Sequence, residues 1–220
     1  MFRIKICGIT RPEDAEHAAD CGADAIGINF FRGSPRRATE EAAREIVSAV
    51  GDRVEVVGVF VNESPDAIVS VCSRLGLRRV QLHGDEPAAD AARLPLWRMK
   101  AVHVSASPDP GALPDYPCEA FLLDAGGRGV FGGTGRVLPW EELAERFPGI
   151  AGPHVPGDTG RPWILAGGLD PGNVMRAIRS ARPFGVDVAS GVESSPGRKD
   201  PGKVASFIER AKEGFRIAET

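Results

Sequence analysis

The 220-residue sequence predicts a single-domain α/β protein, residues 1–220, in which eight strands and their helices close into a (β/α)8 barrel of the TIM-barrel type. Three observations support this prediction. The length is typical of one such barrel, short β-branched runs alternate with segments of helical period, and unusual polar residues follow the ends of the short runs. An open doubly wound sheet is the alternative, but short and evenly spaced apolar runs favour closure.

Eight short runs are rich in β-branched and other apolar residues, and we expect them to form the strands of the barrel. They lie at residues 3–7, 25–29, 54–61, 79–82, 97–102, 120–124, 163–166 and 185–188.

The helices between these strands should begin where a capping side chain precedes an early acid or proline. The predicted caps are Thr10, Thr39, Ser64 and Asp170. In the fifth unit, residues 105–116 are rich in proline, so we expect at most a short helix there. Residues 148–162 contain glycine and proline without an apolar period, which predicts an extended loop.

Composition and charge exclude several functional classes. The net charge is −3 and no block of lysine and arginine stands out, so nucleic acid is not the expected partner. No stretch approaches the roughly 20 apolar residues of a membrane helix, and charge interrupts the N-terminus early, which argues against membrane insertion and secretion. The four cysteines (Cys7, Cys21, Cys72 and Cys118) lack metal-binding spacing, so free thiols and a cytoplasmic location are expected.

A lysine and a cysteine share one face of the first predicted strand. If Ile4 and Ile6 face the helices, the two-residue period directs Lys5 and Cys7 into the barrel. A buried lysine needs a partner, and Asp187 on the neighbouring last strand is the candidate. We therefore predict a Lys5–Asp187 pair beneath Cys7. Cys7 itself is either a small core residue or a functional thiol.

An aspartate ends the sixth predicted strand. Asp124 either starts a turn by bonding to its own backbone or acts as a general acid or base across the barrel mouth from Cys7. The glycine-rich residues 127–132 match G-x-G-x-x-G, but further glycines and a proline keep them from opening directly into a helix. A loop that covers an active site is the better interpretation of this stretch.

Two glycine-containing turns follow the last two predicted strands. Gly167 and Gly168 come after the seventh strand, and Ser190 and Gly191 come after the eighth. Either turn alone is explained as a tight connection. Together they occupy the place where many barrels bind phosphate through backbone N–H groups, so a phosphorylated small molecule is the expected ligand.

Three further side chains are candidates for the pocket. Arg36 follows the second strand and is either solvated or positioned to grip a carboxylate with its fork of donors. Gln81 and His83 share a face at the end of the fourth strand and are expected to line the pocket. Two roles are open for His83: it orients its neighbours or it transfers protons.

Taken in order, these motifs resemble those of the phosphoribosylanthranilate isomerase family of tryptophan biosynthesis. A single motif is weak evidence, but the order and spacing of all of them over nearly the whole chain are specific. The matching segments are residues 5–10, 34–36, 57–60, 80–84, 122–124, 132–135, 166–169 and 186–193.

The resemblance implies an aldose–ketose isomerase that converts N-(5-phosphoribosyl)anthranilate to 1-(2-carboxyphenylamino)-1-deoxyribulose 5-phosphate by an Amadori rearrangement, without cofactor or metal. It implies that Asp124 protonates the sugar ring oxygen and that Cys7 removes the C2 proton of the resulting Schiff base. It also implies that Arg36 holds the anthranilate carboxylate and that the two glycine turns hold the phosphate. We expect Lys5 to favour the Cys7 thiolate, and the enzyme to be a monomer or a homodimer.

Two kinds of alternative remain at this point. The first kind is another phosphosugar barrel enzyme. A related isomerase of histidine biosynthesis would have an aspartate where this chain has Cys7. Indole-glycerol-phosphate synthase would have a lysine and glutamate pattern that is missing here. The second kind of alternative is a barrel that binds phosphosugars without catalysing a reaction. Only the pairing of Cys7 with Asp124 argues against it. The chain departs from the family pattern at Asn29, where an apolar residue is usual, and in the long segment 148–162, which should lie opposite the active site.

Overall fold

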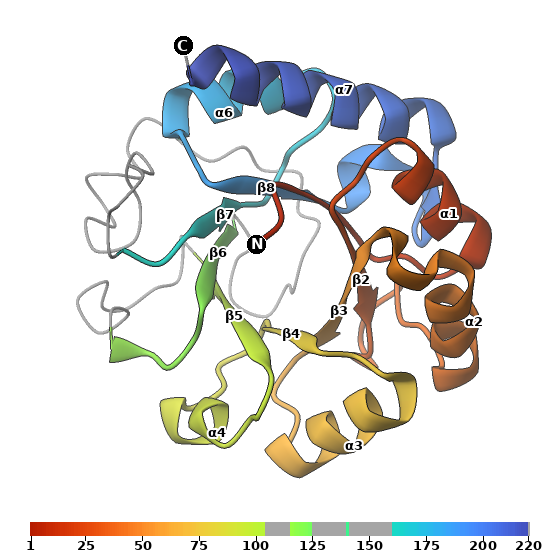
Figure 1. Cartoon of the computed structure of the whole chain (residues 1–220), viewed down its shortest axis with the longest axis vertical. Coiled ribbons are helices and arrows are strands. Elements are labelled where there is room, and N and C mark those ends of the chain that lie inside the picture. Colours follow the sequence, from red (N-terminus) through yellow and green to blue (C-terminus); the bar gives the residue numbers. More distant parts are fainter. Residues whose placement is uncertain (104–114, 125–139, 141–159, 220) are drawn as a thin grey trace.

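The computed structural model describes residues 1–103, 115–124, 140 and 160–219. Strands β1 to β8 form a closed barrel in chain order, and every neighbouring pair, including β8 with β1, is parallel (Figure 1). The closed barrel confirms the predicted fold class. The strands are β1 Ile4–Cys7, β2 Ala25–Asn29, β3 Glu55–Phe60, β4 Arg79–Leu82, β5 Trp97–His103, β6 Ala120–Asp124, β7 Trp163–Leu165 and β8 Gly185–Val188.

Helices surround the barrel on its outside, as Figure 1 shows for both the N-terminal and the C-terminal units. After β8 the chain forms a 3-10 turn and a small antiparallel hairpin before the last helix. The bounds are α1 Pro12–Asp20, α2 Glu40–Val50, η1 Gly51–Arg53, α3 Pro65–Leu75, α4 Ala88–Ala92, α6 Val174–Ala181, η4 Ser190–Val192, β9 Glu193–Ser195, β10 Arg198–Lys199 and α7 Pro201–Ala218.

Two of the four predicted helix caps are confirmed. The side chains of Thr39 and Ser64 accept the backbone N–H groups of the residues three positions on, at the starts of α2 and α3. Thr10 is not a cap, because its hydroxyl donates to the carbonyl of Gly197 in the β9–β10 hairpin. Asp170 is also not the cap of α6. Its carboxylate accepts two backbone N–H groups in the turn that precedes that helix.

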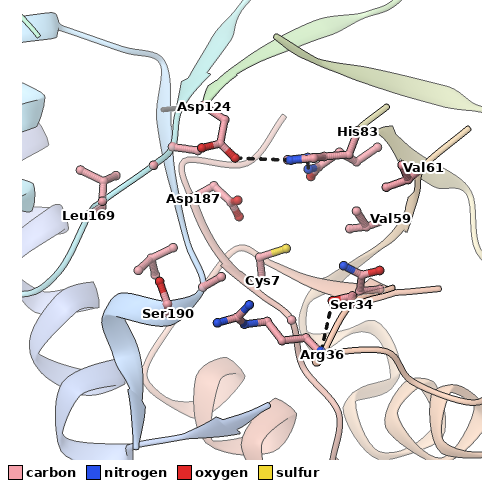
Figure 2. Close-up of a pocket in the computed structure, with 18 residues that line it drawn as sticks. Cys7, Ser34, Arg36, Val59, Val61, His83, Asp124, Leu169, Asp187 and Ser190 are labelled. Carbon is pink, nitrogen blue, oxygen red and sulfur yellow. Dashed lines mark hydrogen bonds and ion pairs between the residues drawn. The ribbon is translucent and has the colours of Figure 1, made fainter. Parts of the chain in front are cut away.

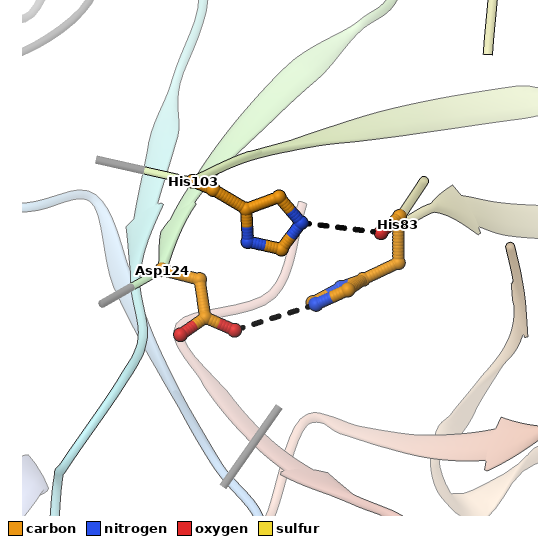
Figure 3. Close-up of side chains that lie close together, drawn as sticks. All are labelled: His83, His103 and Asp124. Carbon is orange, nitrogen blue, oxygen red and sulfur yellow. Dashed lines mark hydrogen bonds and ion pairs between the residues drawn. The ribbon is translucent and has the colours of Figure 1, made fainter. Parts of the chain in front are cut away.

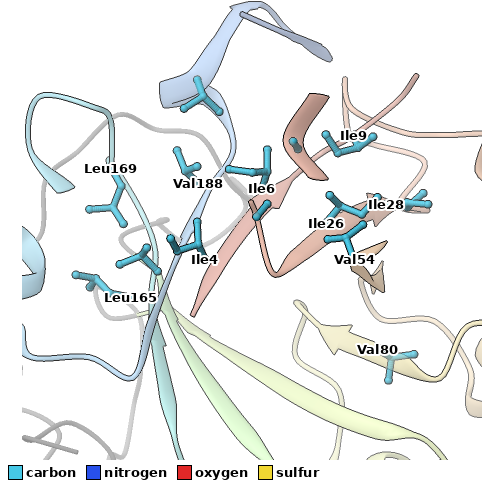
Figure 4. Packing of buried hydrophobic residues seen from close by; sticks show 14 of the residues in the cluster. Ile4, Ile6, Ile9, Ile26, Ile28, Val54, Val80, Leu165, Leu169 and Val188 are labelled. Atoms are coloured by element: carbon cyan, nitrogen blue, oxygen red, sulfur yellow. The ribbon is translucent and has the colours of Figure 1, made fainter. Parts of the chain in front are cut away.

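Two apolar layers explain why the barrel closes. The alternation of side chains along each strand sends one set outward against the helices and the other inward. The outer layer includes Ile4, Ile6 and Val188 (Figure 4), and the inner layer, formed by residues such as Met99 and Leu122, fills the barrel interior. Lys5 and Cys7 alternate with the two isoleucines, so both face inward as predicted.

Several predicted features lie outside the described residues. They are the fifth helix over most of residues 105–116, the covering loop at 127–132 and nearly all of the extended loop at 148–162. Among the helices that are described, none is long and apolar enough to cross a membrane.

Candidate active site

A cleft of about 710 Å³, counting the open space at its mouth, lies at the carboxyl ends of the barrel strands (Figure 2). This is the end at which β/α barrels carry their active sites. The lining includes every residue predicted for the site except Gly191. The predicted residues that line it are Cys7, Arg36, Gln81, His83, Asp124, Gly167, Gly168, Asp187 and Ser190.

The predicted ion pair beneath the cleft is present. Lys5 and Asp187 are register partners on β1 and β8, and the lysine Nζ lies 2.8 Å from the aspartate Oδ1. Lys5 is completely buried. Burial lowers the pKa of Lys5, but the charge of Asp187 and the neighbouring Cys7 outweigh this effect and raise it overall. Lys5 therefore stays positively charged inside the barrel.

The Cys7 thiol lies at the end of β1, above Lys5. Gly27 on β2 makes room for it, because a Cβ there would come within 2.8 Å of the Cys7 sulfur and 3.1 Å of the Lys5 Nζ. Burial raises the pKa of Cys7, and the opposing effect of Lys5 is too small to reverse the shift. Lys5 thus favours the thiolate, as expected, but the effect of burial is larger, so the pKa of Cys7 lies above its ordinary value and the thiol keeps its proton at neutral pH.

Gln81 and His83 join the ion pair to Asp124 on the far side of the cleft. Lys5 Nζ donates to Gln81 Oε1 at 3.0 Å, and the Gln81 amide nitrogen lies 2.6 Å from His83 Nδ1. His83 Nε2 is 3.3 Å from Asp124 Oδ2, and a dashed line in Figure 2 marks this contact. This separation is within ion-pair reach, but within the described part of the chain His83 Nε2 makes no well-directed hydrogen bond. Polar side chains thus connect the predicted base region to the predicted acid.

A second histidine, which the sequence analysis missed, lies beside this group. His103 ends β5, and its ring packs edge-on against His83 with centroids 5.2 Å apart. Burial, followed by the nearby His83, lowers the pKa of His103 and favours its neutral form. One ligand atom from each of His83, His103 and Asp124 lies within 4.8 Å of the others (Figure 3), and two imidazoles with a carboxylate are donors that a divalent transition metal accepts.

Arg36 lies on the opposite wall, where a carboxylate fixes its orientation. Its Nε and Nη2 both donate to Glu193, each at 2.8 Å, and Lys199 Nζ lies 3.0 Å from the same carboxylate. Burial of Glu193 opposes ionisation, but Arg36 and Lys199 together hold the pKa of Glu193 below its ordinary value. The pairing with Glu193 uses Nε and Nη2, and Arg36 also lines the cleft, so a second carboxylate could bind on the Nη1 side of the guanidinium.

The two glycine turns meet at the third wall. Gly167 and Gly168 have φ angles of +86° and +69°, which glycine adopts without strain. Gly191 lies behind the wall rather than on it. A Cβ there would come within 1.9 Å of the Leu169 carbonyl oxygen, so only glycine allows the two turns to pack this closely. The first N–H groups of η4 have no acceptor within the helix, and such groups can bind an anion.

Glu193 and Lys199 were not among the predicted site residues. Glu193 is the last residue of the matching segment 186–193, so its position carried some signal, but its partner Arg36 is distant in the sequence. Lys199 comes from the β9–β10 hairpin, which the sequence analysis did not predict.

Comparisons with known proteins agree on one family. A family model described as N-(5'-phosphoribosyl)anthranilate (PRA) isomerase matches residues 4–210. The N-(5'-phosphoribosyl)anthranilate isomerase of Trichlorobacter lovleyi is 43% identical over 215 residues, covering 98% of this chain and 100% of that protein.

Solved structures show the same likeness. The phosphoribosyl anthranilate isomerase of Thermotoga maritima is 39% identical, with a TM-score of 0.82, 97% of this chain covered and 100% of that one. Another structure from that organism is of monomers generated from the dimeric enzyme. A further phosphoribosyl anthranilate isomerase, in complex with reduced 1-(o-carboxyphenylamino)-1-deoxyribulose 5-phosphate, is 38% identical, with a TM-score of 0.80, 97% of this chain covered and 100% of that one.

Proposed function

The chain belongs to the N-(5'-phosphoribosyl)anthranilate isomerase family, and from this premise we propose how its own residues carry out the reaction. The activity is the isomerisation of N-(5'-phosphoribosyl)anthranilate in tryptophan biosynthesis, an Amadori rearrangement from an aldose to a ketose derivative. The observation that carries the proposal is one cleft in which Cys7 and Asp124 lie on different strands, with Arg36 and a glycine turn at its edges.

Asp124 is the general acid and Cys7 the general base. Asp124 gives its proton to the sugar ring oxygen as the C1–O bond breaks, which yields an open-chain Schiff base. Cys7 then removes the proton from C2, and the electrons of that C–H bond form the enolamine, which rearranges to the ketone. The positions of the two side chains, at the ends of β1 and β6, support roles on different sides of a bound sugar.

The remaining site residues hold the two charged ends of the substrate. Arg36 binds the anthranilate carboxylate through the edge that Glu193 leaves available. The phosphate binds at Gly167, Gly168 and the start of η4, with Gly191 supporting that turn. Anchoring both ends orients the sugar carbons between acid and base, which can contribute several kcal/mol to lowering the barrier.

The direct test is turnover of phosphoribosylanthranilate, followed by the change in anthranilate fluorescence. The purified chain should convert the substrate without added metal or cofactor, and the rate should survive a chelator. A chain that binds the substrate and does not turn it over would instead be a phosphosugar-binding barrel. Turnover of the corresponding histidine-pathway substrate at a similar rate would contradict the assignment of specificity.

Arg36→Met is expected to weaken binding of the reduced product analogue by about ten- to a hundredfold, the effect of losing a charged bidentate contact. Arg37→Met is the matched control, because Arg37 is the next residue and is exposed. Fluorescence titration measures both affinities. Equal losses would show that general positive charge, rather than a specific contact, attracts the carboxylate.

Inorganic phosphate is expected to compete weakly with the substrate, because backbone N–H groups rather than a lysine or arginine hold the phosphate. Steady-state rates at several phosphate concentrations should show a higher apparent KM and an unchanged kcat. Sulfate should act alike, and chloride at equal ionic strength is the control. A mixed or absent effect would place the phosphate elsewhere.

The pH dependence should follow the raised pKa of Cys7. The thiolate is the active base, and a raised pKa leaves it scarce at neutrality, so its population grows as the pH rises. The value of kcat/KM reports on the free enzyme, and we expect it to rise about tenfold per pH unit above pH 7 until Cys7 is ionised or another group limits the rate. A flat profile from pH 7 to 9 would show that Cys7 is already ionised or is not the base.

We further propose that residues 1–220 act as one functional unit in the cytoplasm, with a phosphorylated small molecule as the ligand. The closed barrel and the four free cysteines support this proposal. Monomer and homodimer both remain predictions, and light scattering at working concentration separates them.

A further inference from the structure

A continuous chain of buried polar side chains crosses the barrel from β8 to β6. It runs through Asp187, Lys5, Gln81 and His83 to Asp124, with successive separations of 2.8, 3.0, 2.6 and 3.3 Å. All five residues are buried. The proposed mechanism gives a chemical step only to Asp124. The other four side chains are linked through donors and acceptors in a fixed order, and this order determines where His83 carries its proton.

Lys5 fixes the orientation of the Gln81 amide. The raised pKa of Lys5 keeps it an ammonium group, which has N–H donors and no acceptor. The Gln81 atom that faces it at 3.0 Å must therefore be the amide oxygen. This assignment follows from the chemistry of the partner, and it directs the Gln81 NH2 group toward His83.

Gln81 in turn fixes the proton of His83. An amide NH2 group can only donate, so His83 Nδ1, 2.6 Å away, must be the acceptor and carries no proton. A proton on Nδ1 would place two N–H groups against each other in a buried site. We propose that Lys5, acting through Gln81, holds His83 as the neutral Nε2–H tautomer, with that N–H facing the carboxyl group of Asp124.

The arrangement suits a general acid, which must keep its proton until the sugar ring opens and then lose it. This inference rests on the proposed role of Asp124 as that acid. A neutral imidazole does not hold Asp124 as an anion in the way an imidazolium would. When Asp124 gives its proton to the ring oxygen, the new carboxylate can accept the His83 N–H, which makes no well-directed hydrogen bond to the described residues beforehand. A contact that strengthens as charge develops lowers the barrier. His83 keeps its own proton throughout, and Lys5 and Gln81 are positioning residues.

The proton on His83 Nε2 also decides whether His83, His103 and Asp124 suit a metal ion. A metal would need the lone pair of His83 Nε2, but the tautomer set by Gln81 places a proton on that atom. When a histidine binds a metal, its other ring nitrogen normally donates its proton to a neighbouring acceptor, whereas the other ring nitrogen of His83 accepts from Gln81. The surroundings of His83 therefore favour an N–H donor over a metal ligand.

Long-range ¹H–¹⁵N correlation spectra of the whole chain, labelled at histidine and measured without substrate, test the proposal. The chain has four histidines, and loss of one signal set in His83→Asn assigns His83. At pH 8 the wild type should show the Nε2–H pattern. An Nδ1–H pattern, an imidazolium or a rapid mixture of tautomers would overturn the proposal.

Gln81→Glu is the decisive variant, because a carboxylate of the same shape accepts from both Lys5 and His83. The His83 signals should change to the Nδ1–H or doubly protonated pattern, and kcat should fall about tenfold or more with little change in KM. If Gln81→Glu does not fold, Gln81→Met should give a mixture of tautomers and a similar loss of kcat.

An unchanged His83 spectrum in a folded Gln81 variant, or a changed spectrum with wild-type kcat, would overturn the positioning role. The spectra need no substrate. Failure of the wild-type turnover assay would therefore contradict the proposed function and leave the tautomer result standing.

Discussion

Cys7→Ala is expected to lower kcat by about two to four orders of magnitude and to leave KM nearly unchanged, because it removes the base and not a substrate anchor. The ion pair of Lys5 and Asp187 beneath it remains intact in the variant, so the barrel should fold normally. Steady-state fluorescence measures turnover, and titration with the reduced product analogue measures binding. Catalysis should be lost while binding survives.

Cys21→Ala is the matched control, since Cys21 lies at the end of α1, outside the barrel, and should leave kcat unaffected. Iodoacetamide should inactivate the enzyme through Cys7, more rapidly as the pH rises, because burial raises the pKa of this thiol. The product analogue should protect it. Near-wild-type turnover in Cys7→Ala would contradict the assignment of the base and would make His83 the next residue to replace.

Asp124→Asn is expected to produce a loss of similar size, about two to four orders of magnitude in kcat, because an amide cannot supply the proton that opens the ring. The substitution keeps the shape of the side chain at the end of β6 and retains an oxygen that can accept the His83 N–H. Affinity for the product analogue should therefore stay close to that of the wild type. A parallel loss of binding would show that Asp124 mainly holds the substrate.

The double variant Cys7→Ala/Asp124→Asn separates two ways in which acid and base could act. If they serve successive steps, ring opening followed by C2 proton removal, the double variant should be about as slow as the slower single variant. If both acted in one step, their effects would multiply. Multiplicative losses would contradict the stepwise scheme proposed here.

Local patterns in the sequence were enough to predict the barrel and the residues that line its cleft. Alternating apolar runs and helix signals define βα units, and a period of two along a strand places Lys5 and Cys7 on the same face. Closure of the barrel then makes β1 and β8 neighbours, which was enough to predict the pair with Asp187. These inferences succeeded because each depends on local periodicity plus one topological rule.

Helix starts show where local signals are insufficient. Thr39 and Ser64 cap the helices that follow them, but Thr10 bonds to Gly197, far away in the sequence, and the carboxylate of Asp170 closes a separate turn. All four positions hold residue types that commonly cap helices. A distant partner or one extra turn changes the outcome, and neither is visible in a short window of sequence.

The protonation state of Cys7 was decided by tertiary structure alone. Lys5, one layer below, favours the thiolate, but burial of Cys7 disfavours the charged form more strongly. Desolvation depends on every element packed around the sulfur, and Gly27 on the neighbouring strand shows how closely they approach. No pattern in the sequence measures that burial.

Only the tertiary structure could also reveal the partners that orient the site. Arg36 is held by Glu193 and Lys199, which come from the segment after β8. His83, directly after β4, receives its tautomer from Lys5 on β1 through Gln81 on β4. Sequence motifs identify the residues that line the cleft, because these lie at strand ends. The side chains that set their orientation and protons are brought together by closure of the barrel, and their spacing in the sequence carries no sign of the contact.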